Sequence, residues 1–184
     1  MSPRDFARTA LSELEVVVNL LDDAEIRAAC ERIFAARRIM VYRCGREGLM
    51  MRALAMRLHH LGLSVSVQGD MTAPPLSCGD LFVASAGPRE LSTVNALIDA
   101  AVDAGAAILF LTAVPDTPAS ARSSLVLQIP AQTHANENAA ASVLPMGSLY
   151  EGTIFILFEA MVNELTRRLA QSAKDMRARH TKME

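Results

Sequence analysis

Short apolar runs alternate with helix-like segments through the middle of the chain, and this alternation most limits what it can fold into. Five runs are typical of buried strands: 38–42, 64–68, 81–84, 107–111 and 125–129. Helices are predicted between them at 49–61 and 90–104, with a short helix or turn at 115–122. Strands that alternate with helices form right-handed crossovers. The sequence therefore predicts an α/β fold with a parallel sheet covered on both faces.

Helical periodicity marks both ends of the chain. Apolar residues recur at helical spacing over 6–21, and Asp22 and Asp23 then favour a break and an N-cap for a helix over 24–36. A long helix is predicted from about residue 148 to 169. Its apolar residues lie nearly all round, which predicts burial on more than one side and hence a subunit interface.

The chain of 184 residues fits a single domain with appended helices. We divide it into a helical segment (1–37) that packs on the domain, the domain itself (38–170) and a charged tail (171–184) that is frayed or docks on a neighbouring subunit. The polar segment 131–142 is predicted to be an exposed connection.

Composition excludes several classes of protein. A formal charge of −2 and 4% aromatic residues without Trp argue against a nucleic-acid binder. Three cysteines without a CxxC spacing, and four histidines without an HExxH string, argue against a disulfide framework or a metal site. The polar N-terminus and the short apolar stretches predict a cytoplasmic protein that does not cross a membrane.

Ligands of parallel sheets bind at the carboxyl ends of the strands, which directs attention to the turns at 43–48, 69–75 and 85–90. Arg43-x-Gly45-x-x-Gly48 is typical of a phosphate-binding turn or of a tight turn without a ligand. Ser85 could bind an anion or cap the following helix. Arg89 could bind an anion or be a solvated charge.

Two further positions could carry chemistry. Glu151 lies in the first turn of the last long helix, where a carboxylate serves as a general base or as a plain helix cap. His60, beside His59, is predicted as a packed or surface residue, and His180 lies among arginines near the end of the chain.

Several strings together resemble one family, the sugar isomerase (SIS) domain family, in its 6-phospho-3-hexuloisomerase branch. They lie at 55–62, 67–74, 79–81, 144–151 and 179–180, and the resemblance covers nearly the whole chain. Met56-Arg57-Leu58-x-His60-Leu61-Gly62 and Pro145-Met146-Gly147-Ser148-x-Tyr150-Glu151 are specific in combination.

This resemblance implies a single SIS domain, a three-layer α/β/α sandwich with a five-stranded parallel sheet in flavodoxin-like order. It implies a homo-oligomer, a tetramer or dimer with shared active sites, that interconverts 3-hexulose 6-phosphate and fructose 6-phosphate through an enediol without a metal or redox cofactor. Glu151 would be the base, and His180 an acid/base delivered by another subunit's tail. The implied substrate-binding residues are Gly45, Arg46, Glu47, Gly48, Thr72, Ser85, Gly87, Arg89, His60 and Ser148.

The ligand turns depart from the family pattern. The family's first turn reads Gly-x-Gly-Arg-Ser-Gly and corresponds to residues 43–48 of this chain. Here Arg43 replaces the first Gly, and Glu47 replaces the phosphate-binding Ser. In the second turn Pro88 removes a backbone donor and Glu90 replaces a Thr. A carboxylate about 4 Å from a phosphate costs on the order of 4 kcal/mol per pair of unit charges at an effective dielectric near 20.

Arginines could offset this repulsion. Arg43, Arg46 and Arg89 could pair with the two glutamates or bind the phosphate themselves. Two alternatives to the isomerase therefore stay open. One is a non-catalytic SIS module that binds an amine-bearing or less charged sugar, and the other is a scaffold kept for oligomerisation.

Overall fold

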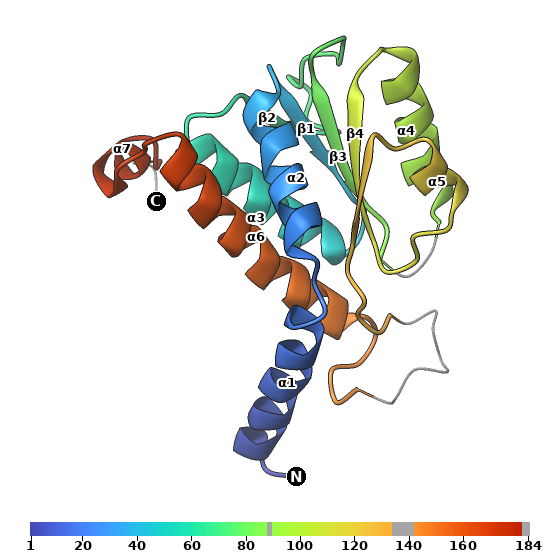
Figure 1. Cartoon of the computed structure of the whole chain (residues 1–184), viewed down its shortest axis with the longest axis vertical. Coiled ribbons are helices and arrows are strands. Elements are labelled where there is room, and N and C mark those ends of the chain that lie inside the picture. Colours follow the sequence, from blue (N-terminus) through green and yellow to red (C-terminus); the bar gives the residue numbers. More distant parts are fainter. Residues whose placement is uncertain (88–89, 134–141, 182–184) are drawn as a thin grey trace.

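One sheet of five parallel strands forms the centre of the computed structural model, which describes residues 1–87, 90–133 and 142–181 (Figure 1). The strand order is β2-β1-β3-β4-β5. The strands are β1 (Ile39–Tyr42), β2 (Val65–Val67), β3 (Leu81–Ser85), β4 (Ala107–Thr112) and β5 (Leu125–Gln128). The order reverses between β1 and β3, and in such sheets this is the point where ligands bind.

Helices cover both faces of the sheet because successive strand residues point to opposite sides. Val41, Val83 and Leu109 pack toward α2 (Asp23–Ala35), α3 (Glu47–His60) and α6 (Ser148–Arg168). Met40, Phe82 and Ile108 pack toward α4 (Ser92–Asp103) and α5 (Pro118–Ala121). The predicted three-layer α/β fold and the flavodoxin-like strand order are therefore confirmed.

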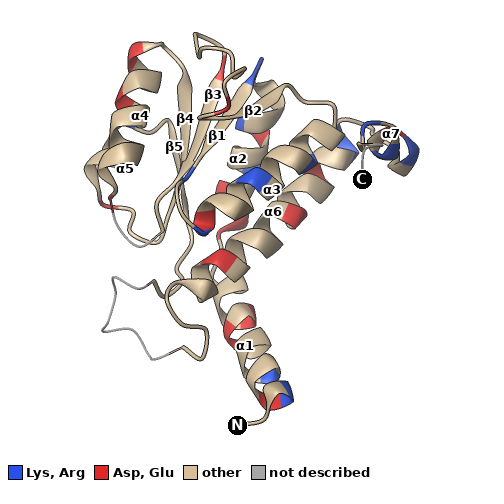
Figure 2. Cartoon of the chain, turned by 180° about the vertical axis from the view of Figure 1, so that it is seen from behind, with Lys and Arg blue, Asp and Glu red and all other residues tan. Residues whose placement is uncertain are grey.

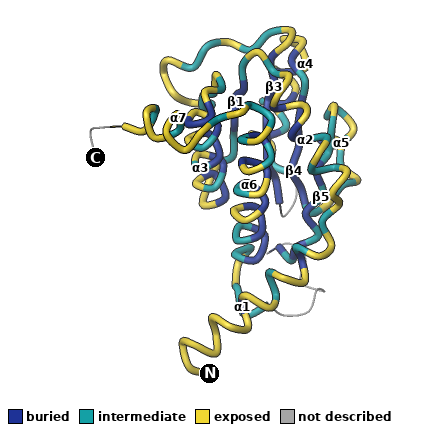
Figure 3. The backbone as a smooth tube through the Cα atoms, turned by 60° about the vertical axis from the view of Figure 1, so that its left-hand side comes forward, coloured by how far each residue is buried: buried dark blue, intermediate teal, exposed yellow. Residues whose placement is uncertain are grey.

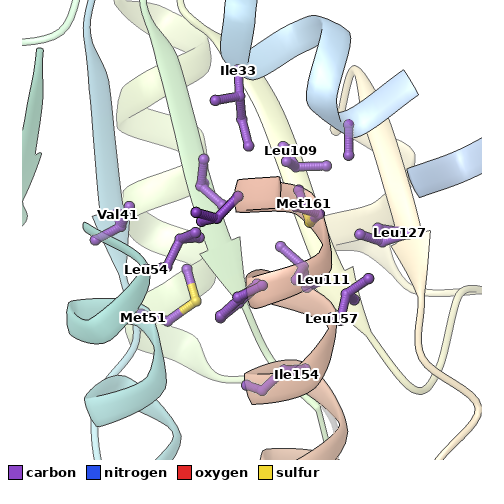
Figure 4. Packing of buried hydrophobic residues seen from close by; sticks show 14 of the residues in the cluster. Ile33, Val41, Met51, Leu54, Leu109, Leu111, Leu127, Ile154, Leu157 and Met161 are labelled. Carbon is purple, nitrogen blue, oxygen red and sulfur yellow. The ribbon is translucent and has the colours of Figure 1, made fainter. Parts of the chain in front are cut away.

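The largest apolar cluster lies between the sheet and α6. Ile154, Leu157 and Met161 of α6 pack with Leu109, Leu111 and Leu127 of the sheet (Figure 4). The helix also contacts α1, α2 and α3, so its own chain buries it on several sides. Phe155 and Ile156 stay 51% and 39% exposed. The dense apolar pattern of this helix is thus largely explained within one protomer, with a small exposed remainder.

The first and last helices lie apart from the sheet (Figures 1 and 3). Helix α1 (Pro3–Val18) contacts α6 and then extends away from the rest of the molecule, with most of its residues exposed. Helix α7 (Ala173–Ala178) contacts α3 of the same chain. Docking of this tail on a neighbouring subunit stays a prediction.

Most differences from the sequence predictions concern element boundaries. Helix α1 begins at Pro3 rather than residue 6, because the Ser2 hydroxyl caps it by accepting the Asp5 N–H at 3.1 Å. Asp22 caps α2, as predicted. The predicted exposed connection at 131–142 is wrong at its start, since Ala131 and Thr133 are buried against the domain. Residues 134–141 of this connection lie outside the described residues.

Candidate functional site

A cavity of about 370 Å³ opens where the carboxyl end of β1 meets the first turns of α3 and α6. Acidic and basic positions meet at this end of α3 (Figure 2). The cavity draws residues from three distant parts of the chain: Arg43, Cys44, Gly45, Arg46, Glu47, Thr133, Met146, Gly147, Tyr150 and Glu151. It therefore lies at the point where the strand order reverses, as the fold predicts for a ligand site.

The turn after β1 is shaped by two glycines. Gly45 has φ +70°, a conformation that side chains other than glycine rarely adopt. A Cβ atom on Gly48 would lie 2.1 Å from the Arg43 carbonyl oxygen, so only glycine fits there. The chain thus turns tightly from β1 into α3 and brings Glu47 into the first turn of that helix.

The Glu47 side chain points into the protein rather than into solvent and is 5% exposed. Its Oε1 accepts hydrogen bonds from the Ser85 hydroxyl and from the Gly87 N–H at 3.2 Å. Its Oε2 accepts a hydrogen bond from Arg43 Nε at 2.9 Å. Arg43 therefore pairs with Glu47, which is one of the two roles that the sequence left open for it.

Tyr150 closes the inner side of the site. Its hydroxyl lies 3.1 Å from Ser85 Oγ, and its ring packs against Gly87, where a Cβ atom would lie 2.7 Å from the ring. Burial is the main cause that raises the pKa of Tyr150 well above its ordinary value, and the Glu47 charge adds to it. Tyr150 is thus a neutral hydrogen-bonding partner at neutral pH.

Glu151 and Arg46 form an ion pair at the mouth of the cavity, with Nε and Oε2 2.5 Å apart. Arg46 also donates to the Ser148 hydroxyl and to the Met146 carbonyl oxygen, each at 3.0 Å. Burial raises the pKa of Glu151, while the Arg46 charge opposes this rise. The result is a carboxylate that faces the cavity beside a guanidinium and is more basic than usual.

Thr133 belongs to the candidate site, although no pattern in the sequence indicated it. It lines the cavity, is 3% exposed, and its hydroxyl has no hydrogen-bond partner among the described residues. A buried hydroxyl without a partner is unfavourable, so a ligand that bonds to it gains from the contact. Tyr150 was also not predicted as a site residue, although its position next to Glu151 in the sequence indicates that it lies near the site.

Several residues expected at the site lie elsewhere in this chain. His60 ends α3, about 20 Å along the helix from Glu47, and its ring stacks on that of His180 with centroids 5.2 Å apart. Thr72 is exposed and is not among the residues that line the cavity. Arg89 lies outside the described residues.

Glu90 does not face the cavity. Its carboxylate instead accepts the Ala119 N–H of α5 at 3.2 Å. Of the two carboxylates in the altered turns, Glu47 therefore lines the cavity and Glu90 does not. No cluster of three or more metal-ligating side chains occurs among the described residues.

A model of the SIS domain matches residues 32–154. The chain belongs to the SIS domain family. A relative from Mycobacterium gastri named 3-hexulose-6-phosphate isomerase is 34% identical over 164 residues, which cover 89% of this chain and 82% of the relative. A relative of the same name from Bacillus subtilis is 25% identical over 185 residues, which cover 100% of both chains. The two relatives put the chain in the 6-phospho-3-hexuloisomerase branch.

Solved structures of other proteins that are similar to this SIS domain confirm the fold. One is a protein from Methanococcus jannaschii with an inferred function of 3-hexulose-6-phosphate isomerase. It superposes with a TM-score of 0.84 at 21% sequence identity, and the match covers 97% of this chain and 98% of that one. Another is the sugar isomerase domain of a transcription factor from Sphaerobacter thermophilus. It superposes with a TM-score of 0.71 at 17% sequence identity, and the match covers 96% of this chain and 94% of that one. The same fold thus occurs in proteins named as isomerases and as regulators.

Proposed function

We propose that this SIS domain is a phosphosugar isomerase that interconverts 3-hexulose 6-phosphate and fructose 6-phosphate through an enediol. The observation that carries the proposal is Glu151, a cavity-facing carboxylate whose pKa is raised by burial. The names of the isomerase relatives support the substrate pair.

Glu151 has the properties that this reaction requires of its base. To move a carbonyl by one carbon, the base takes a proton from the carbon beside the carbonyl and returns it to the former carbonyl carbon. The hydroxyl proton of the carbon that becomes the new carbonyl passes to the oxygen of the former carbonyl, so that no atom is gained or lost overall. Arg46 holds the carboxylate in place and favours its ionised form, so that it can accept the proton.

The role that the family pattern suggests for His180 requires a second subunit. Within one protomer His180 stacks on His60 at the far end of α3 from the cavity. We therefore propose a homo-oligomer, a tetramer or dimer, in which a neighbouring tail reaches the site. Thr72, His60 and Arg89 join the substrate site under the same proposal.

A second candidate is a non-catalytic SIS module with a changed ligand. Glu47 favours it, since this carboxylate takes donors that a ligand's phosphate would otherwise use. The sugar isomerase domain of a transcription factor shows that the fold also occurs in regulators.

Replacing Glu151 by Gln tests the isomerase. We expect kcat for fructose 6-phosphate to fall at least 100-fold, the range for losing a general base, with an unchanged thermal midpoint. Glu159→Gln is the matched control on the same helix, since Glu159 pairs with Arg57 outside the cavity. A Glu151→Gln protein with kcat within threefold of the wild type would show that Glu151 is not the base. A wild type that binds the sugar without turnover would favour the second candidate.

A further inference from the structure

The Glu47 carboxylate lies where the chain presents the donors that suit an anion. A hydroxyl from Ser85, the backbone N–H of Gly87 and the Nε of Arg43 all point to its two oxygens. Hydroxyl, amide and guanidinium donors are the set that proteins use to bind phosphate. We call the groups of Ser85, Gly87 and Arg43 the cradle. In this chain the cradle holds one of the protein's own side chains.

The charges around the cavity are already balanced. Arg43 pairs with Glu47, and Arg46 pairs with Glu151, so the four charged residues that line the cavity sum to zero. A phosphate entering the cradle would meet the Glu47 charge and would find both arginines engaged. An uncharged hydroxyl meets no such repulsion, and the Thr133 hydroxyl on the cavity wall offers it a hydrogen bond.

We propose that Glu47 determines specificity by closing the cradle to phosphate, so that the cavity binds an unphosphorylated sugar at least as tightly as its 6-phosphate. The inference rests on the proposed function only in placing the sugar in this cavity. It leaves proton transfer at Glu151 unchanged. A 6-phosphate that enters with the sugar gains no affinity from the cradle.

Calorimetric titration of the wild-type protein with fructose, fructose 6-phosphate and inorganic phosphate tests the proposal directly. We expect the Kd of fructose 6-phosphate to be no lower than that of fructose, and inorganic phosphate not to compete. A Kd for fructose 6-phosphate at least tenfold below that of fructose, together with competition by phosphate, would overturn the proposal.

Substitutions at Glu47 test its role in this closure. Glu47→Ser empties the cradle and frees Arg43, and we expect it to bind both phosphate and fructose 6-phosphate at least tenfold more tightly than the wild type. Glu47→Gln removes the charge but keeps the volume, and we expect a smaller gain. If Glu47→Ser fails to fold, the Glu47→Gln protein and the wild-type titration still decide the question.

Glu90→Ser is the matched control, because Glu90 also stands in an altered turn but bonds to α5 outside the cavity. We expect its affinities to equal those of the wild type. Equal phosphate affinities for the wild type and both Glu47 variants would refute a role for Glu47 in specificity. These titrations are independent of the Glu151→Gln kinetics, so either proposal can fail while the other stands.

Discussion

Two buried carboxylates occur among the described residues, Glu47 and Asp80, and arginine holds each of them. Asp80, just before β3, accepts hydrogen bonds from Arg37 at 3.1 Å, from Arg38 at 3.0 Å and from the Ser77 N–H at 2.9 Å. Burial alone would raise its pKa, but these hydrogen bonds outweigh burial and lower the pKa of Asp80 to about 2. Asp80 thus ties the connection between α2 and β1 to the start of β3 through its charge.

The low pKa of Asp80 makes its contribution to stability depend on pH. Because the folded pKa of about 2 lies below the ordinary value of 3.8, the contribution is complete above about pH 4 and is lost as the pH falls toward 2. We expect Asp80→Asn to lower the free energy of unfolding at pH 7 by about 1–3 kcal/mol, the range for losing such hydrogen bonds. Urea unfolding at several pH values should show this difference shrink between pH 4 and pH 2.

Glu159→Gln serves as the control for Asp80, because the Glu159–Arg57 ion pair is partly exposed. We expect a loss of at most about 1 kcal/mol, as for surface ion pairs. A difference between Asp80→Asn and wild type that is constant from pH 7 to pH 2 would contradict the assigned ionisation of Asp80.

At the scale of elements, α7 is a short helix on the surface of the domain. None of its six residues is buried. Met176 of this helix packs against the main apolar cluster, and Arg179 lies just beyond the end of the helix. The Arg179 guanidinium donates to the His60 carbonyl oxygen at 2.9 Å and to the Gln171 side chain at 2.7 Å. The same guanidinium packs on Gly62, where a Cβ atom would lie 3.0 Å away.

Arg179→Ala should therefore release α7 without unfolding the domain. We expect faster amide exchange in residues 173–178 and a thermal midpoint within about 2 °C of the wild type, because little apolar surface is lost. Arg177→Ala is the control, since Arg177 is exposed on the same helix. Unchanged exchange in the Arg179→Ala protein would show that other contacts hold α7 in place.

The whole molecule leaves apolar surface exposed on its projecting helix. Leu11 and Val16 of α1 are 65% and 59% exposed, and Leu20 just beyond its end is 62% exposed. A contact between subunits along α1 would remove such side chains from water, which is favourable. This surface supports the proposed homo-oligomer. No helix of the described chain has the length and hydropathy needed to cross a membrane.

The proposed homo-oligomer predicts a solution mass that is a multiple of the 19.8 kDa chain. Light scattering after gel filtration measures it directly. We expect Leu11→Glu combined with Val16→Glu to shift the mass toward one chain, because two charges would have to be buried without partners. Arg4→Glu with Arg8→Glu, on exposed positions of the same helix, is the control for added charge. A wild type that elutes as a single chain would refute the oligomer.

Periodicity and capping alone predicted the order of the elements, the parallel sheet and the turns that carry the site. These signals are local, since alternating strands and helices permit few ways to bury their apolar faces. The sequence also indicated Glu151 and the substitution at Glu47 through the family pattern.

Only the tertiary structure decided which partners these side chains take. Glu47 and Glu90 are both acidic replacements in ligand turns, yet one fills the cradle and the other bonds to α5. Thr133 and Tyr150 join the cavity from segments more than 80 residues beyond Arg43. A side chain's partner depends on which backbone donors converge from distant parts of the chain, and that convergence exists only once the sheet and its helices have packed.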